Sequence, residues 1–219
     1  MKSREQKMQA GKSRRRKDQG TQCGLLDLDE APSGHRVALL IVIAITGSMF
    51  VIEMIGGYLS SSHALTADAL DFLHDVLVYA LSLAVIGTTK RTRAAAALLM
   101  AGILCVTSLG VLTSAIYHSF IPELPHAGVM GFVGALGILA NLGSIAILAP
   151  HIGERRLFSI YEENSRPSIL GNIAVIATAV AVWGLQSPWP DLVIGIAASA
   201  QLFRSALQML QSALRARCR

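Results

Sequence analysis

The sequence predicts an all-α, polytopic membrane protein with six transmembrane helices, and two observations carry this prediction. The chain has 219 residues, of which 53% are hydrophobic and only 15% are charged. That is too little charge to cover the surface of a soluble domain of this size. The apolar residues also fall into long blocks, each near the ~20 residues that a helix needs to cross the hydrocarbon core of a bilayer. Blocks this long and continuous exclude the tilted strands of a membrane barrel.

The blocks define the expected domain organisation. They lie at about 37–59, 64–87, 94–121, 127–150, 168–187 and 190–212. We expect them to form one transmembrane domain over residues 37–214. A basic tail over residues 1–36 is poor in apolar residues and is expected to be disordered. Residues 215–219 would form a second, short tail.

The positions of the basic residues predict the orientation in the membrane. All 19 Lys and Arg can be placed on one side, since they fall within 2–36, 90–93, 155–166 and 204–219. The opposite turns, near "SSSH", "IPELPHAG" and "QSPWPD", contain none. The positive-inside rule therefore places both termini in the cytoplasm and requires an even number of spans. The net charge of +5 is then mostly a topology signal.

Several other functions lack support in the sequence. The segment "KSRRRK" could touch anionic lipid or nucleic acid, but a topology anchor explains it, and we expect no nucleic-acid partner. The three cysteines show no CxxC spacing, so no disulfide framework or zinc finger is indicated. No HExxH motif, phosphate-binding Gly-rich loop or Ser-His-Asp arrangement is found, so we expect no enzyme and no cofactor.

The stretch "ADALDFLHDVLVYAL" in the second block combines polar and apolar residues in an unusual way. Positions i, i+3, i+4 and i+7 share one face of a helix, so Asp68, Asp71 and Asp75 form one stripe, with His74 at its edge. Each charged group costs a few kcal/mol inside a membrane helix. Such a stripe suits an ion site or a proton relay. The alternatives are that the carboxylates are protonated or hydrogen-bonded to tolerate burial, and that Asp68 reaches water or caps a neighbouring helix.

A cation site needs ligands from further helices, and the other blocks supply candidates. In the fifth block Ser168 and Asn172 are i, i+4, so both could add neutral oxygens to the site, although small polar residues also join helices. Asn141 in the fourth block fits a packing hydrogen bond as well as a ligand. Glu53 in the first block is a functional candidate as a lone intramembrane acid, or else it bonds to a neighbouring span.

The polar residues near the outer turns suit structural roles. Asp191 stands at a helix start, where capping is expected. His63, His118 and His126 also lie near outer turns, and we expect them to be solvated rather than metal ligands. Glycines such as Gly56 indicate close helix packing.

The stretch "EMIGGYLSSSHALTADALDFLHD", residues 53–75, resembles the first two spans of the cation diffusion facilitator family, also called the cation efflux or cobalt-zinc-cadmium resistance-like family. That family has a Glu in span one, a Gly pair, a Ser-rich outer turn and a metal-binding second span. Its two ligands four residues apart fall on Asp71 and Asp75. The six spans and "WPDL" before the last one also match, so the resemblance covers about residues 36–214.

The resemblance implies export of divalent cations of the zinc, cobalt, cadmium and manganese class from the cytoplasm, in exchange for protons and by alternating access. It implies a homodimer in the lipid of a membrane, which we expect to be the bacterial inner membrane. The transported ion is then the substrate, bound by Asp71, Asp75, Ser168 and Asn172. Carboxylates at low dielectric suit this mechanism because they can exchange a proton for a cation.

Two departures from the family pattern leave an alternative open. Family members carry His or Asp and then Asp at the positions of Ser168 and Asn172. An all-oxygen set favours harder ions such as manganese, unless His74 turns inward to add a nitrogen. The sequence also ends at Arg219, so we expect the form without a C-terminal cytoplasmic domain. The alternative is a transport-inactive relative that acts as a partner or regulatory membrane subunit.

Overall fold

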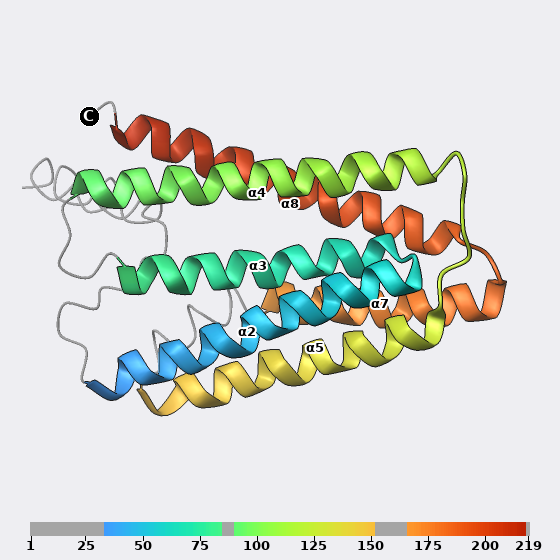
Figure 1. Cartoon of the computed structure of the whole chain (residues 1–219), viewed down its shortest axis with the longest axis horizontal. Helices are drawn as coiled ribbons and strands as arrows, with labels where there is room; N and C mark the ends of the chain where they lie inside the picture. Colours follow the sequence, from blue (N-terminus) through green and yellow to red (C-terminus); the bar gives the residue numbers. More distant parts are fainter. Residues whose placement is uncertain (1–32, 85–89, 152–165, 218–219) are drawn as a thin grey trace, which may run out of the picture.

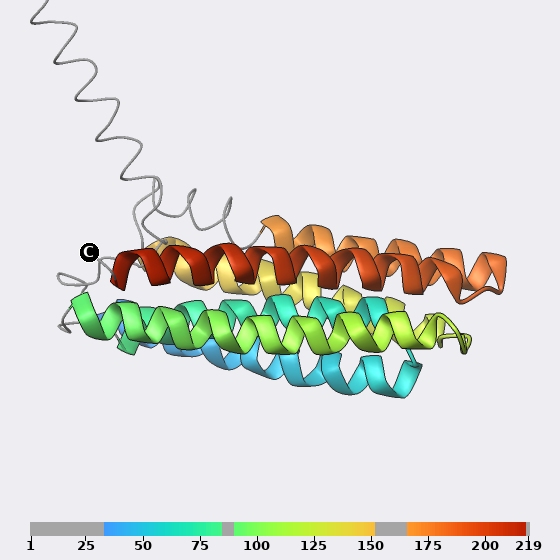
Figure 2. The same cartoon turned by 90° about the horizontal axis from the view of Figure 1, so that it is seen from above.

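The computed structural model describes residues 33–84, 90–151 and 166–217, and these ranges contain helices but no strand (Figure 1). The helices, in chain order, are α2 Ser33–Ser60, α3 His63–Ala84, α4 Lys90–His118, α5 Ala127–Leu148, the short 3-10 helix η1 Ala149–His151, α7 Arg166–Leu185 and α8 Trp189–Arg217. Figures 1 and 2 show the α-helices side by side along one long axis. The predicted all-α class is therefore confirmed.

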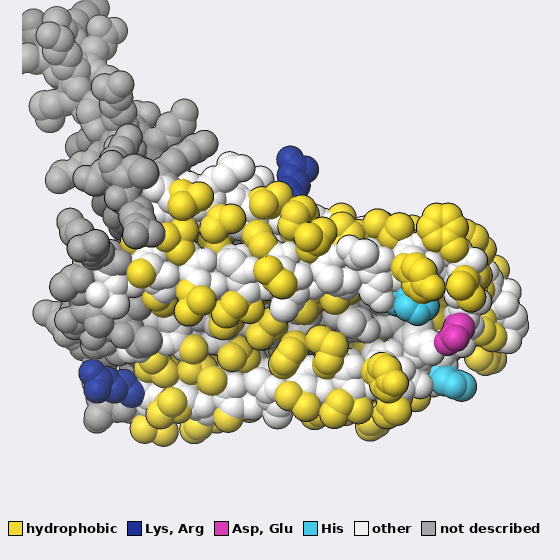
Figure 3. Space-filling model, turned by 45° about the horizontal axis from the view of Figure 1, so that its top comes forward, with side chains coloured by type: hydrophobic (Ala, Val, Ile, Leu, Met, Phe, Trp, Pro, Cys, Tyr) yellow, Lys and Arg dark blue, Asp and Glu magenta, His cyan; other side chains and the backbone are white. Residues whose placement is uncertain are grey.

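The surface of the bundle is apolar, as a lipid-facing surface should be. Many large hydrophobic side chains are exposed, among them Phe120 at 80% and Trp183 at 73%. Figure 3 shows hydrophobic side chains along the length of the visible face. Five helices are long and apolar enough to cross a membrane. The sixth, α3, has 22 residues but contains three aspartates. The chain is therefore a polytopic membrane protein.

Three connections meet at one end of the bundle, which we call the turn end: residues 61–62, 119–126 and 186–188. Two of the turns are tight because Ser61 and Gln186 adopt left-handed conformations, with φ of 52° and 48°. None of the three connections contains Lys or Arg. These are the connections that the positions of Lys and Arg predict to lie together on the outer side of the membrane.

Several helix ends differ from the predicted spans, because the helical backbone does not end where the run of apolar residues ends. α2 begins at Ser33, inside the predicted tail, and α8 continues to Arg217, beyond 212. A helix can continue past its apolar core into the polar headgroup region. Conversely, α4 ends at His118 rather than at 121, because Pro122 disfavours helical backbone at the residue before it. Residues 1–32 of the predicted tail, 85–87 of the second span and 218–219 lie outside the described ranges.

Buried apolar clusters flank the polar part of α3. Near the turn end, Leu65 packs with Met130 and Val175. Further along, Tyr79 packs with Leu39, Val42 and Leu148. The stripe of aspartates lies on α3 between Leu65 and Tyr79 and is thus enclosed by apolar packing on both sides along the helix axis.

Candidate functional site

The acidic stripe of α3 faces the interior of the bundle. Asp68 and Asp75 are 4% and 3% exposed, and Asp71 between them is half-buried. They follow one another at intervals of three and four residues, as one face of a helix requires. Of the two structural alternatives for Asp68, contact with water at the outer end is wrong in this structure, because its side chain is buried.

The absence of a side chain at Gly171 lets α7 approach this stripe. A β-carbon at Gly171 would collide with Oδ1 of Asp68 and would lie 3.4 Å from Oδ2 of Asp71. The two carboxylates therefore lie directly against the backbone of α7. Gly171 stands between Ser168 and Asn172, so the glycine places the polar face of α7 beside that of α3.

A second glycine, Gly137 on α5, makes room for Glu53 and Asn172. A β-carbon there would lie 2.7 Å from Oε1 of Glu53 and would collide with the side-chain amide of Asn172. Both polar side chains are fully buried, at 0% exposure. Glu53 comes from α2 and Asn172 from α7, so three helices bring these groups to one point. Asn141 is one turn further along α5 and is 3% exposed.

Several buried polar atoms in this cluster have no hydrogen-bond partner among the described residues. They are both carboxylate oxygens of Glu53, Oδ2 of Asp68, Oδ1 of Asn172 and Nδ2 of Asn141. The Asn172 amide is oriented by its nitrogen, which donates to the carbonyl oxygen of Ser168 at 3.0 Å. A buried unpaired acceptor costs ~1–3 kcal/mol. These oxygens are therefore positions where a proton or a cation would be stabilised.

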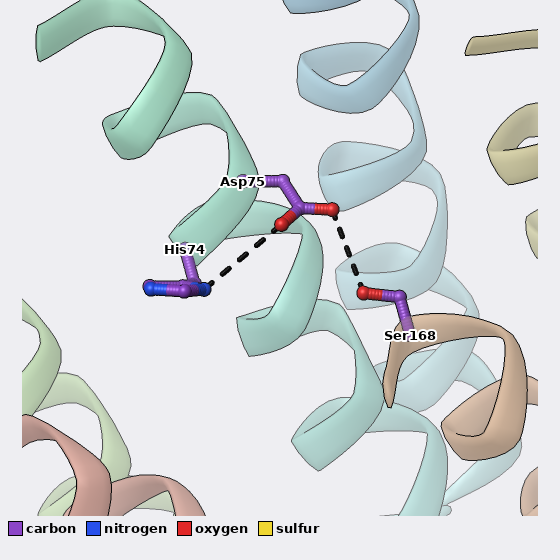
Figure 4. Close-up of polar contacts among 3 residues, drawn as sticks. All are labelled: His74, Asp75 and Ser168. Carbon is purple, nitrogen blue, oxygen red and sulfur yellow. Dashed lines mark hydrogen bonds and ion pairs between the residues drawn. The ribbon is translucent and has the colours of Figure 1, made fainter. Parts of the chain in front are cut away.

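Asp75 connects α3 to α7 at the other end of the stripe (Figure 4). The hydroxyl of Ser168 donates to its Oδ2 at 3.5 Å. His74 Nδ1 lies 3.9 Å from Oδ1 of Asp75. However, Figure 4 shows the imidazole on the side of α3 away from Ser168. In this conformation His74 does not add a nitrogen to the set formed by Asp75 and Ser168.

The predicted site residues thus come together from α2, α3, α5 and α7, apart from His74. Asp68 and Asp71 lie against Gly171 of α7, whereas Glu53 and Asn172 lie against Gly137 of α5. Within the described ranges, no three His, Cys, Asp or Glu side chains are arranged to hold one metal ion. An ion here would therefore need neutral oxygens, such as those of Ser168 and Asn172, or water. Sequence reasoning missed Gly171, whose only signal was its place between these two residues.

Asp191 has the capping role that was predicted, but for another helix. It stands at the start of α8, yet its carboxylate accepts hydrogen bonds from the backbone N–H groups of His63, at 2.7 Å, and Ala64, at 3.2 Å. Its Oδ1 also accepts from the Ser62 hydroxyl at 2.5 Å. The N–H groups of His63 and Ala64 belong to the first turn of α3, where a helix offers them no acceptor of its own. One carboxylate therefore joins the turn before α3 to α8.

We expect Gly137→Ala to destabilise the protein by ~1–3 kcal/mol, because the added methyl group must displace two fully buried polar side chains. The measurement is unfolding by sodium dodecyl sulfate in mixed micelles. Gly143→Ala on the same helix is the control, because a β-carbon there meets nothing within 4 Å. That change should be neutral or stabilising by up to ~1 kcal/mol. Equal effects of the two substitutions would contradict the close approach at Gly137.

Comparison with known proteins gives a consistent result. A family model described as the cation efflux transmembrane domain matches residues 39–216. The metal cation efflux system protein CzcD of Cupriavidus metallidurans is 26% identical over 198 residues, which cover 84% of this chain and 62% of that protein. The zinc transporter ZitB of Escherichia coli is 26% identical over 191 residues, covering 80% and 60%. ZitB of Pectobacterium atrosepticum is 29% identical over 199 residues, covering 83% and 61%. The chain thus spans between 60% and 62% of the length of these relatives.

Proposed function

The chain belongs to the cation efflux family, and on this premise we propose that it exports divalent metal cations from the cytoplasm in exchange for protons. The observation that carries the proposal is a cluster of four carboxylates inside a bundle with an apolar surface: Glu53, Asp68 and Asp75 are buried, and Asp71 is half-buried. Ionisable groups are expensive in a membrane and mark ion or proton pathways. We propose a transporter rather than an enzyme because the matching family model describes cation efflux.

In the proposed mechanism, Asp71 and Asp75 bind the ion together with neutral oxygens of α7. The Oδ1 atom of Asn172 has no hydrogen-bond partner among the described residues, so its lone pairs are open to a cation. The Ser168 hydroxyl donates to Asp75, which leaves its oxygen able to accept a cation as well. Because a carboxylate binds either a proton or a metal ion, protons entering from outside would displace the cation. Alternating access would expose the site first to the cytoplasm and then to the other side.

The donor atoms favour certain ions but do not select a single one. Two carboxylates, a hydroxyl and an amide oxygen form an all-oxygen set, which favours hard ions such as manganese. The similar proteins named above are called a metal cation efflux system protein and zinc transporters, so zinc also belongs to the candidate set. Cobalt and cadmium enter the proposal from the family resemblance of residues 53–75. We further propose cytoplasmic termini, since the basic residues lie on one predicted side. The homodimer and the bacterial inner membrane are proposed from the family resemblance alone.

A second candidate function rests on the neutral residues of α7. With Ser168 and Asn172 in the site, no three ionisable or thiol ligands converge among the described residues. A transport-inactive subunit that binds a partner membrane protein would keep the fold without needing metal affinity.

The test is metal uptake by the full chain reconstituted in lipid vesicles whose lumen is more acidic than the bath. Uptake of zinc, cobalt, cadmium and manganese is measured in parallel, with protein-free vesicles as the control. We expect uptake of at least one ion, and we expect it to cease when an ionophore dissipates the pH gradient. No uptake of any ion by protein shown to be folded would contradict the exporter and favour the inactive subunit.

A further inference from the structure

A cavity of about 900 Å³ with a mixed apolar and polar lining lies at the turn end of the bundle, and none of the four carboxylates of the cluster lines it. Residues of α2, α3, α4 and α8 and of the connections 61–62 and 119–126 line it. The polar ones include His63, Ser114, His118, Glu123 and Asp191. Figure 3 shows that histidine and acidic side chains of the visible face gather at this end. From the sequence alone, we expect these histidines only to be solvated. Their arrangement in the cavity indicates a further role.

Two imidazole rings face one another across this cavity. His63 opens α3 and His118 closes α4, and their ring centroids are 4.8 Å apart with an interplanar angle of 43°. Two nitrogens bound to one tetrahedral zinc at ~2.0–2.1 Å lie ~3.4 Å from each other. A centroid separation of 4.8 Å places the two rings close enough for one ion to contact a nitrogen of each. Both rings are half-buried and therefore accessible to an ion in the cavity.

The structure also defines which nitrogen of His118 is available. Its Nδ1 lies 2.8 Å from the carbonyl oxygen of Ser114. A carbonyl oxygen can only accept, so Nδ1 carries the hydrogen and donates it. In the neutral ring Nε2 then keeps its lone pair, which is the state required of a metal ligand. A histidine that donates its other N–H to a backbone carbonyl is the usual arrangement around bound metals.

The position of His63 is fixed by its neighbours. Its backbone N–H donates to Asp191, and a β-carbon at Gly195 of α8 would lie 2.7 Å from the His63 β-carbon. The side chain therefore leaves α3 in close contact with α8. Glu123 lines the same cavity and accepts a hydrogen bond from Ser61 at 3.1 Å. The carboxylates of Glu123 and Asp191 supply negative charge that attracts a cation.

We propose that His63 and His118 form a second binding site for a divalent first-row cation that favours nitrogen ligands, such as zinc, cobalt or copper. No third His, Cys, Asp or Glu joins them among the described residues, so the ion keeps water ligands and binds more weakly than in a closed site. The proposed binding rests on the separation of the two rings and on the hydrogen bond of His118 Nδ1 to Ser114. Its role, to receive the ion leaving the carboxylate cluster, rests on the proposed export function.

The test is zinc titration of the purified full-length protein in detergent, by calorimetry and without any gradient. The Asp75→Ala background removes a proposed ligand of the carboxylate cluster and so weakens zinc binding there. In this background we expect one zinc site, which weakens at least tenfold when either His63→Ala or His118→Ala is added. His126→Ala is the matched control: this histidine is also at the turn end but is exposed and lines a different cavity. It should leave the affinity unchanged.

A spectroscopic measurement on the unmodified protein tests the site without requiring that any variant folds. One equivalent of copper bound to the otherwise unmodified protein should give an electron paramagnetic resonance signal with coupling to two imidazole nitrogens. A signal without imidazole coupling would overturn the proposal. So would the absence of zinc binding in the Asp75→Ala background, or zinc binding that both histidine substitutions leave unchanged. If zinc binds at the histidine pair but the protein shows no metal flux, the export proposal is wrong and the proposal of the second binding site stands.

Discussion

Asp75→Ala is expected to reduce gradient-driven metal uptake by about 100-fold. Asp75 is 3% exposed, and its carboxylate on α3 accepts a hydrogen bond from the Ser168 side chain on α7, the other helix of the proposed site. A contact with a charged group contributes ~1.5–3 kcal/mol, and ~2.7 kcal/mol corresponds to a factor of 100 in affinity. The measurement is the vesicle uptake described above, at a metal concentration below saturation.

The control for this experiment is a buried polar residue outside the cluster. Ser144 on α5 is 6% exposed, and its hydroxyl donates to the carbonyl oxygen of Ala140 within the same helix. Ser144→Ala should therefore retain uptake close to that of the unmodified protein. Asp75→Asn keeps the size of the side chain while removing the charge, and it should fail as Asp75→Ala does. Undiminished uptake by either Asp75 variant would place the transport site elsewhere.

Asp191→Ala is expected to lower the free energy of unfolding by about 3 kcal/mol. The substitution removes three hydrogen bonds to a carboxylate that is 1% exposed. The O–H donor of the buried Ser62 and the Ala64 N–H then lose the acceptor that Asp191 provides, although the Ser62 oxygen still accepts from the Leu65 N–H. Loss of a helix cap alone costs ~0.5–2 kcal/mol, and buried unpaired groups add to this. Unfolding in mixed micelles measures the change.

Two further variants serve as an intermediate case and as a control for the loss of stability. Asp191→Asn keeps one carbonyl acceptor, so its loss of stability should fall between zero and that of Asp191→Ala. Glu123→Ala removes an exposed acid at the same end, with one hydrogen bond to the exposed Ser61, and should change stability by less than ~0.5 kcal/mol. If Asp191→Ala were as mild as Glu123→Ala, the three hydrogen bonds would have no net stabilising effect.

The fold class could be predicted from the sequence because lipid imposes simple rules. Long apolar blocks must be helices. The acidic stripe on α3 was also predictable, since positions along one helix fix which residues share a face. The helix ends were less predictable, because helical hydrogen bonding continues past the apolar residues at Ser33 and Arg217.

Contacts between helices were the part of the site that the sequence could not define. Gly171 has no chemistry of its own, and only the approach of α7 to Asp68 reveals its role. Asp191 was expected to cap a helix, but its partner is 127 residues away at Ala64. His63 and His118 become neighbours only because α3 begins where α4 ends. Each of these contacts depends on how helices pack, which local patterns do not specify.

The carboxylate of Asp191 also bears on the rate of the proposed transport cycle. Opening the turn end by separating α3 from α8 would break its three hydrogen bonds before new ones form. Every ~1.4 kcal/mol added to a barrier slows a step about tenfold. In the proposed cycle, release of the ion at this end would then be slowed and would depend steeply on temperature. The contact that stabilises the folded bundle would thereby also limit its turnover.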